Sequence, residues 1–477
     1  MENQKFDIGM IGMGVMGRNL LLNMADHGFK VLGQNKSEEK IAALEADATP
    51  GTTVKGVTSL TEFISLLEVP RRIMLLVPAG KPVDDVIETL IPLLEQGDII
   101  IDAGNSYYKD TVRRDAYLRE IGLRFLGVGV SGGEEGARTG PSIMPGGDEN
   151  AYHYLQPLLE AIAAKVNNVP CVGYLGKYGA GHYVKMVHNG IEYGIMQLIS
   201  EAYQLLHEGL ELTNDELSEL FTKWDNEDMT SYLIEITADI FLYQDDKTEN
   251  RRLVDMILDK AGSKGTGKWT SQDAIDLPVP IPTIDMAVSM RNISSFKKER
   301  VAAAELYNPA SKKLDVDKDV FIEQVHDALF FATLISYVQG LAMLQTASRQ
   351  LNMEIPMPEV VKVWRGGCII RSSLLDVFIK AFEQDPMIPN LLLDRGIAQM
   401  LQSKEQNMRQ VIIKGVEKGF AAGAFMASLS YYDAYRTANL PTNLIQAQRD
   451  YFGAHTYQRV DDPTGPFLHT EWMKVKL

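Results

Sequence analysis

The sequence predicts an α/β Rossmann domain, followed by a large all-α duplicated helical domain and an irregular C-terminal tail. Three observations predict this order. Short apolar runs alternate with helical patterns over residues 1–179, long amphipathic patterns without strand signals fill residues 180–440, and the periodicity weakens over residues 441–477. At about 150 residues per domain, the 477-residue chain has room for about two to four domains.

Six apolar runs in the first domain have the length of strands. Each is followed by a Gly, Pro or Asn turn and then by a helix-like stretch, which is typical of a parallel sheet with crossover helices. The expected strands are residues 6–11, 30–34, 73–77, 98–102, 124–130 and 142–144.

The helical domain repeats itself at nearly one spacing. The tetrapeptide VHNG at 187–190 returns in type as VHDA at 325–328, and the segment around Trp224 resembles the segment around Trp364. These matches predict two tandem units, at about 180–315 and 316–440, although two unrelated amphipathic bundles could look alike at this level. The tail that follows is rich in aromatic residues, so we expect it to dock on another surface.

Composition excludes several classes of protein. The 63 acidic residues outnumber the 47 lysines and arginines, and the net charge of −16 argues against nucleic acid as a partner. The two cysteines, Cys171 and Cys368, cannot build a disulfide framework or a cysteine-rich metal site, which favours a reducing compartment. The chain starts without a basic segment leading into an apolar core, and it lacks a run of about 18 apolar residues. We therefore expect a cytoplasmic protein with no membrane partner.

A dinucleotide fingerprint directly follows the first expected strand and opens a helix. In this pattern the first glycine makes a tight turn, the second lets a pyrophosphate approach the backbone, and the third lets helix and strand pack closely. The phosphates then lie at the helix N-terminus. Its position separates it from a chance glycine-rich turn. The residues are Gly12, Met13, Gly14, Val15, Met16 and Gly17.

Coenzyme choice depends on the end of the second strand, where an acidic residue would accept hydrogen bonds from the ribose of NAD. This chain has no acid there until Glu38. Lys36 could instead neutralise a 2′-phosphate, with Asn35 and Ser37 donating hydrogen bonds, so the sequence favours NADP. The alternative is that Lys36 is simply solvated.

A polar stripe in the first helical unit is the catalytic candidate. Its members fall at i, i+3, i+4 and i+7 of a helix and therefore share one face: Lys185, His188, Asn189 and Glu192. Such a stripe is usually a solvent face, but apolar residues surround this one, and glycines at 179, 181, 190 and 194 allow close backbone approach. The second unit has Glu323 and Phe330 at the positions of Lys185 and Glu192, so only the first unit could perform this chemistry.

Seven motifs together carry a resemblance over essentially the whole chain. They are the glycine fingerprint, DAGNS at 102–106, GVSGGEEGAR at 129–138, KMVHNGIEY at 185–193, KGTGKW at 264–269, WRGGCIIR at 364–371 and RDYFGAH at 449–455. With them the chain resembles the long 6-phosphogluconate dehydrogenases, the decarboxylating enzymes of the pentose phosphate pathway. The resemblance implies oxidation of 6-phospho-D-gluconate by NADP+ to D-ribulose 5-phosphate and CO₂ without a metal. It also implies a homodimer whose tails cross into the partner subunit.

The resemblance also implies roles for single residues. Lys185 would be the general base and Glu192 the general acid, and Asn105 would lie between substrate and nicotinamide. The substrate's carboxylate and hydroxyls would be held by Ser131, Gly132, Gly133, His188 and Asn189. Its phosphate would be held by Tyr193, Lys264, Thr266 and Arg291, together with Arg449 and His455 of the other subunit. Beside the fingerprint, the coenzyme would contact Asn35, Lys36, Ser37, Val77, Pro78, Ala79 and Asn105.

These residue types suit the chemistry. A lysine in a partly buried pocket can have its pKa lowered enough to accept a proton from the carbon 3 hydroxyl. Once protonated, it can stabilise the enolate that forms as CO₂ leaves. Glu192 would then protonate carbon 1 of the enediol. The histidines form no HExxH array or comparable metal-ligand pattern.

Two departures from the family pattern concern the coenzyme. Lys36 stands where the long forms usually have Arg, and Pro78 where they commonly have Lys. Lysine lacks the planar fork of arginine, so we expect NADP use with weakened discrimination against NAD.

Two other functions remain open at this level. A short-chain β-hydroxyacid dehydrogenase acting on a non-phosphorylated acid would share the Rossmann start and the lysine, but it would lack Arg449 and His455. A non-catalytic dinucleotide-binding protein is opposed by the intact Lys185 and Glu192.

Overall fold

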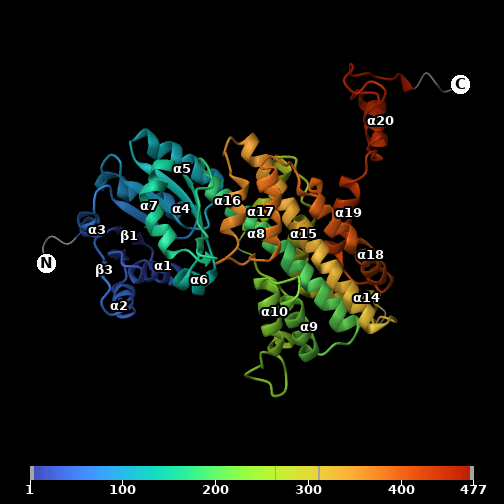
Figure 1. Cartoon of the computed structure of the whole chain (residues 1–477), viewed down its shortest axis with the longest axis horizontal. Coiled ribbons are helices and arrows are strands. Elements are labelled where there is room, and N and C mark those ends of the chain that lie inside the picture. Colours follow the sequence, from blue (N-terminus) through green and yellow to red (C-terminus); the bar gives the residue numbers. More distant parts are fainter. Residues whose placement is uncertain (1–4, 264, 310–311, 473–477) are drawn as a thin grey trace. The chain divides into compact units, whose positions relative to one another are not determined.

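The computed structural model describes residues 5–263, 265–309 and 312–472 (Figure 1). The chain divides after Ser428 into two compact units, Met1–Ser428 and Leu429–Leu477, which are described separately. The expected fold class is confirmed: a Rossmann-type sheet with helices precedes a large helical part.

A seven-stranded sheet forms the core of the first domain, in the order β3-β2-β1-β4-β5-β6-β7. All neighbours pair in parallel except β6 and β7, which are antiparallel. The chain order reverses between β1 and β4, and ligands bind at such switch points, beyond the carboxyl ends of the strands. The strands are β1 (Ile8–Ile11), β2 (Val31–Gln34), β3 (Val54–Val57), β4 (Arg72–Leu75), β5 (Ile99–Asp102), β6 (Arg124–Ser131) and β7 (Ser142–Gly147).

Helices cover both faces of this sheet, because its strands are apolar on both sides. One core contains side chains of α1 and α7, and the other contains side chains of α3 and α4. The helices are α1 (Val15–Asp26), α2 (Glu38–Ala46), α3 (Leu60–Leu66), α4 (Lys81–Leu90), α5 (Tyr108–Glu120), α6 (Gly133–Thr139) and α7 (Glu149–Ile162). A short hairpin, β8 (Lys165–Val166) and β9 (Val169–Pro170), follows.

The helical part is built around two long, buried helices that pack against each other, α8 (Ala180–Gln204) and α15 (Lys318–Gln350) (Figure 1). The others are α9 (Asn214–Asn226), α10 (Tyr232–Leu242), α11 (Leu253–Met256), α12 (Thr266–Asp276), α13 (Pro282–Ser294), α14 (Lys297–Tyr307), α16 (Met357–Val363), α17 (Leu374–Gln384), α18 (Arg395–Glu417), α19 (Gly423–Tyr435) and α20 (Thr442–Gly453). Single turns lie at Ile91–Leu93, Leu205–Gly209 and Leu391–Leu393.

Helix α8 packs closely on strands β6 and β7 where glycines face each other. A Cβ atom on Gly181 would collide with the carbonyl oxygens of Gly127 and Met144. A Cβ atom on Gly129 would lie 2.5 Å from Cβ of Lys185. This glycine seam, formed by Gly127, Gly129 and Gly181, therefore fixes where the Lys185 side chain begins.

The tandem-repeat organisation and its boundaries remain a prediction. Trp224 lies in α9 and Trp364 follows α16, and both indoles are buried. An isolated antiparallel bridge joins Ser231 to Ser372, which are separated by nearly the predicted repeat spacing.

Three details differ from the sequence-based expectations. Strand β3 was not expected, because its short sequence, VKGV, is only partly buried. Strand β7 runs antiparallel, because the ten residues between Ser131 and Ser142 are too few for a parallel crossover. The tail was expected to be irregular, but it begins with α20. That helix starts directly after Pro441, a residue that favours helix starts.

Helix α15 is the one helix in the described part of the chain that is long and apolar enough to span a membrane. Within its most apolar stretch, 94% of the residues are buried inside the protein. A core helix of a soluble protein has the same properties, and α15 packs as such a helix against α8.

Candidate active site

The glycine fingerprint forms a cradle between the end of β1 and the start of α1. Gly12 has a φ of +107°, and a Cβ atom there would collide with the Leu76 carbonyl. A Cβ atom on Gly17 would collide with the Gly12 carbonyl, whereas one on Gly14 would meet no atom within 4 Å. The open space at Gly14 lies at the helix N-terminus, where no acidic residue stands in the first turn. These residues fit a bound pyrophosphate.

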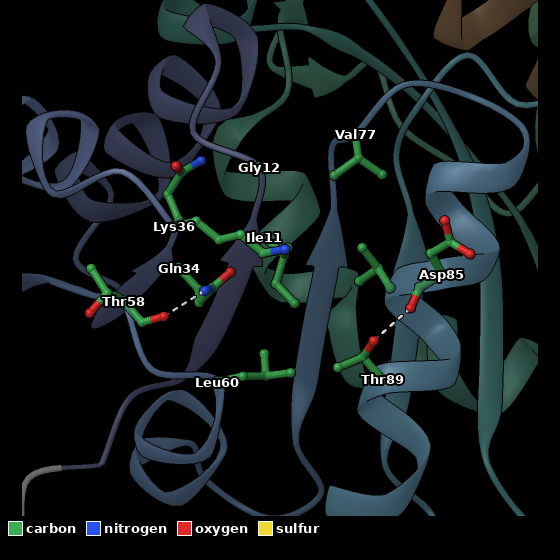
Figure 2. A pocket seen from close by; sticks show the side chains of 11 residues that line it. Ile11, Gly12, Gln34, Lys36, Thr58, Leu60, Val77, Asp85 and Thr89 are labelled. Atoms are coloured by element: carbon green, nitrogen blue, oxygen red, sulfur yellow. Dashed lines mark hydrogen bonds between the residues drawn. The ribbon is translucent and has the colours of Figure 1, made fainter.

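A cleft of about 460 Å³ continues from this cradle at the switch point of the sheet (Figure 2). One wall comes from the ends of β2 and β3 and the other from β4 and α4. Lys36 and Asp85 are the charged side chains among its lining residues, and Asp85 pairs with Lys81 at 2.5 Å. The lining is Ile11, Gly12, Gln34, Asn35, Lys36, Thr58, Leu60, Val77, Asp85, Val86 and Thr89.

The other expected coenzyme residues surround this cleft in different ways. Asn35 Oδ1 accepts a hydrogen bond from the Ser37 amide at 2.9 Å, which leaves the Asn35 amide nitrogen free to donate to a ligand. Pro78 and Ala79 are exposed and do not line the cleft. Met13 is buried in the domain core. Val15 and Met16 begin α1, Val15 exposed and Met16 partly buried.

The four residues of the polar stripe lie on one face of α8, as their spacing predicts. Lys185 is 7% exposed and His188 is fully buried. Lys185 Nζ lies 3.4 Å from His188 Nδ1, which lies 3.0 Å from Asn189 Oδ1. His188 Nδ1 also lies 3.9 Å from Glu192 Oε2. The stripe is therefore an interior cluster of polar groups rather than a solvent face.

Burial drives the electrostatics of this cluster. It lowers the pKa of Lys185, although the charge of Glu192 opposes the shift, and it raises the pKa of Glu192, although Lys185 and Arg291 oppose that shift. Burial and the neighbouring Lys185 lower the pKa of His188 well below its usual range, so the contact of His188 with Glu192 is not an ion pair. Both the amine and the carboxyl are thus shifted toward their neutral forms.

The turn after β6 faces the same cluster. Ser131 is buried, and its Oγ lies 3.4 Å from His188 Nε2. Gly132 has a φ of +119°, and a Cβ atom there would lie 2.7 Å from the Gly367 carbonyl, so this position requires glycine. A Cβ atom on Gly133 would meet open space. The turn can therefore present its backbone to a ligand beside His188.

Asn105 is exposed in the loop that follows β5. The loop is held from below by Asp102, which accepts hydrogen bonds from the Gly104 amide at 3.1 Å and from Ser106 Oγ at 2.6 Å. The buried Arg114 donates to Asp102 at 3.3 Å and so fixes the same carboxylate. This support leaves the Asn105 side chain free for a ligand.

The expected phosphate ligands that belong to the compact unit Met1–Ser428 lie next to the polar stripe of α8, on its C-terminal side. The guanidinium of Arg291 stacks 3.5 Å from the centre of the Tyr193 ring. Asn189 Nδ2 donates to Thr266 Oγ1 at 3.1 Å, which joins α8 to the start of α12. Lys264 lies outside the described residues. The structure thus brings Tyr193, Thr266 and Arg291 together with the polar stripe.

Arg449 and His455 belong to the second unit. Both are exposed, Arg449 on α20 and His455 just after it. Arg449 Nη1 donates to Gln446 Oε1 at 3.2 Å.

Sequence reasoning missed Asp273 on α12. Its carboxylate is buried and accepts hydrogen bonds from the hydroxyls of Tyr108 at 2.6 Å and Tyr183 at 2.7 Å. These bonds join α12 to α5 of the nucleotide domain and to α8. The KGTGKW motif, four residues upstream, was the only local signal, and it does not point to Asp273.

Among the described residues, no three His, Cys, Asp or Glu side chains gather as a metal site. The expected metal independence remains a prediction.

Comparisons with known proteins cover nearly the whole chain. The NAD binding domain of 6-phosphogluconate dehydrogenase matches residues 7–176, and the 6-phosphogluconate dehydrogenase C-terminal domain matches residues 181–472. The NADP(+)-dependent, decarboxylating 6-phosphogluconate dehydrogenase of Bacillus subtilis is 52% identical over 471 residues, which cover 98% of this chain and all of that protein. The decarboxylating enzyme of Escherichia coli is 49% identical over 470 residues, 98% of this chain and 99% of that one.

A solved structure is similar over the same length. It is 6-phosphogluconate dehydrogenase of Plasmodium falciparum, described in its apo form, with NADP+ and with 6-phosphogluconate. The TM-score is 0.95 at 43% identity, with 98% of this chain and 100% of that chain covered.

Proposed function

The chain belongs to the 6-phosphogluconate dehydrogenase family and is an NADP-dependent, decarboxylating enzyme, and on this premise we propose how its own residues act. The substrate is 6-phospho-D-gluconate, and the products are D-ribulose 5-phosphate and CO₂. When bound, the coenzyme supplies the acceptor for the hydride from carbon 3. The observation that carries the proposal is the placement of the buried Lys185 and the partly buried Glu192 on one face of α8, in the same compact unit as a cradle that fits a dinucleotide.

Lys185 is the general base in this proposal. Burial lowers the pKa of its amine, so the neutral form that accepts the proton of the carbon 3 hydroxyl is accessible. The resulting ammonium then faces the ketone oxygen. There it stabilises the negative charge that develops as the carboxylate leaves as CO₂, in a site where water does not screen it. The glycine seam supports this role, because it fixes the start of the Lys185 side chain against β6.

Glu192 is the general acid that delivers a proton to carbon 1 of the enediol. Burial raises the pKa of its carboxyl, so the protonated form persists above the usual range. The reaction needs a neutral amine and a neutral carboxylic acid at its start, and burial favours both of these forms. Two turns of α8 separate the residues, so they can approach the two neighbouring reacting carbons of a bound sugar acid from different sides.

The remaining polar groups bind the substrate. Ser131, the backbone of Gly132 and Gly133, and the amide of Asn189 hold its carboxylate and hydroxyls, with neutral His188 beside them. Asn105 lies between substrate and nicotinamide. Tyr193, Lys264, Thr266 and Arg291 bind the phosphate.

The rest of the phosphate site comes from a second copy of the chain. We propose a homodimer in which Arg449 and His455 of one subunit complete the site of the other. Their exposure supports this role, because nothing in their own unit neutralises them within the described residues: the hydrogen bond of Arg449 is to an uncharged amide. A soluble sugar-phosphate substrate and a reducing compartment, which suits two free cysteines, favour a cytoplasmic enzyme.

Coenzyme preference follows from the cleft at the switch point. Lys36 is the cation among its lining residues, and the carboxylate of Asp85 lies on the opposite wall (Figure 2). A single lysine binds a 2′-phosphate as a point charge without the geometry of arginine. We therefore propose that the enzyme uses NADP but discriminates against NAD less strongly than an enzyme with arginine at position 36 would.

One assay in deuterium oxide tests the assigned acid. The wild-type enzyme should convert 6-phosphogluconate to ribulose 5-phosphate with one deuterium in a single configuration at carbon 1, because one positioned group delivers it. In Glu192→Gln, NADPH and CO₂ should still form, but slowly, and the configuration should be lost because water protonates the enediol. Retention of a single configuration in this variant would reject Glu192 as the acid. Wild-type protein that reduced NADP+ equally well with non-phosphorylated acids would favour the β-hydroxyacid alternative.

A further inference from the structure

We propose that Gln446 is a positioning residue that holds Arg449 and His455 together as one anion-binding clamp. The inference rests on the proposed role of these two residues in binding the substrate phosphate. It concerns contacts inside the second unit only.

The Gln446 amide contacts both clamp residues at once. Its Oε1 accepts a hydrogen bond from Arg449 Nη1 at 3.2 Å. Its Nε2 donates to the carbonyl oxygens of His455 at 3.0 Å and Thr456 at 2.5 Å. Because Nε2 faces two acceptors and Oε1 faces a donor, these partners set the orientation of the amide.

The turn that carries His455 needs such a tether. Ala454 has a φ of +49° and Thr456 a φ of +40°, so non-glycine residues on both sides of His455 lie in the left-handed region. This region is costly for a β-branched residue such as Thr456, and such backbone persists where surrounding contacts enforce it. The two hydrogen bonds from Gln446 supply these contacts.

The geometry of α20 places the clamp on one face. Gln446, Arg449 and Gly453 follow each other at i, i+3 and i+7. A Cβ atom on Gly453 would lie 2.7 Å from Cδ2 and Nε2 of His455, so the imidazole lies directly over this glycine. Arg449 and the His455 ring therefore emerge from the same side of the helix.

Asp450 fixes a different side of the same helix. Its side chain is fully buried and accepts hydrogen bonds from His469 Nδ1 at 2.9 Å, the Thr470 amide at 3.0 Å and Trp472 Nε1 at 2.8 Å. Burial alone would raise the pKa of this carboxyl, but the three donors lower it to about 2. Asp450, the acid next to Arg449 in sequence, thus binds residues 469–472 and does not neutralise the clamp.

The bond to Gln446 also orients the arginine. It uses Nη1 of the guanidinium, which leaves Nη2 and Nε for a ligand, and a phosphate can accept two parallel hydrogen bonds from such a fork. The clamp therefore suits a phosphate monoester dianion better than a lysine ammonium, which acts as a point charge, would.

Kinetics of the full-length enzyme test the proposal. Gln446→Ala should raise the KM for 6-phosphogluconate about tenfold, the cost of lost positioning hydrogen bonds, with kcat changed less than about twofold. Gln446→Glu should raise KM further, because a carboxylate neutralises Arg449 and faces two carbonyl oxygens. Gln448→Ala is the matched control: it removes the same side chain elsewhere on α20, where no hydrogen bond of Gln448 is found among the described contacts, and should leave KM unchanged.

Two further readouts separate positioning from a general structural role. The dissociation constant of NADPH and the subunit assembly measured by light scattering should be unchanged in Gln446→Ala, and so should kcat/KM for gluconate, which lacks the phosphate. A parallel loss for gluconate, or a change in assembly, would overturn the proposal. If Arg449→Ala raised KM while Gln446→Ala did not, the inference would fail and the phosphate role of the tail would stand. If neither variant raised KM, both would fail.

Discussion

Replacing Lys185 by methionine separates the chemistry of this residue from its packing. Methionine has a similar length and no charge, so it fills the same space beside Gly129 on the glycine seam. General base catalysis contributes about 10²–10⁴ in rate, and a charge aimed at the developing enolate about 10²–10³. Taking the lower value of each, we expect Lys185→Met to reduce kcat by about 10⁴ or more, equivalent to about 5.4 kcal/mol in the barrier.

The same change should not destabilise the protein. Burial lowers the pKa of Lys185 in the folded state, so between the folded and unfolded pKa values the unfolded chain binds more protons at this position. The stability that depends on this group is present above the unfolded pKa and lost as the pH falls through the folded pKa. At neutral pH the lysine thus costs stability, and the variant should unfold at the same or a higher temperature.

Three measurements check this prediction. The absorbance of NADPH gives the rate, the fluorescence of bound NADPH gives coenzyme affinity, and thermal denaturation gives stability. Lys318→Met, at an exposed lysine paired with Glu216, is the matched control and should keep full activity. A Lys185→Met enzyme within tenfold of wild-type kcat would refute the assignment of the base. Loss of activity together with loss of NADPH binding would point to misfolding of the site instead.

The other predictions concern the acid, the coenzyme and a second charged cluster. The pH profile of kcat/KM should lose its alkaline limb in Glu192→Gln, because that limb reports deprotonation of the acid while the variant side chain stays neutral; an unchanged limb would contradict the assignment. Lys36→Arg should raise the ratio of kcat/KM for NADP+ over NAD+ about tenfold, and an unchanged ratio would mean that Lys36 does not contact the 2′-phosphate. Burial alone would lower the pKa of His326, but the neighbouring carboxylates of Asp228 and Asp327 raise it to about 9. Its contribution to stability is therefore complete below the unfolded pKa and is lost as the pH rises through 9. Asp228 is half exposed, so solvent screens the pair. His326→Gln should therefore lower the free energy of unfolding in urea by about 1–2 kcal/mol at pH 6 and hardly at all at pH 10. Equal losses at the two pH values would contradict the ion-pair origin.

The spacing of residues in the sequence was sufficient to predict the features that depend only on neighbours in sequence. The glycine fingerprint needs a strand before it and a helix after it, and the stripe from Lys185 to Glu192 needs only helical periodicity. Both features lie where the pattern predicts them. The glycine at 181 also indicated a close backbone approach, but its partners on β6 and β7 are far away in sequence and could not be named.

Features that depend on distant partners were not predictable in this way. Asp273 gains its role from two tyrosines that lie 165 and 90 residues away, and nothing in its own surroundings marks it as buried. The direction of β7 depends on the short connection from β6. The length of that connection indicates an antiparallel pair only once the end of β6 is known. Helix α20 was missed because the aromatic residues at its end resemble an irregular segment, whereas Gln446 and Asp450 stabilise it through residues that follow it.

The glycine seam also limits how enzymes of this kind can vary. At Gly181, α8 meets β6 and β7 backbone to backbone, so no side chain sets the spacing at that point. Surface charge, loop length and the composition of both cores can then drift, or be redesigned for heat tolerance, while the Lys185 side chain keeps its starting point against β6. A Cβ atom on Gly129 would collide with Lys185 itself, and one on Gly181 with the backbone of β6 and β7, which makes these two positions the ones to leave untouched in an engineered variant.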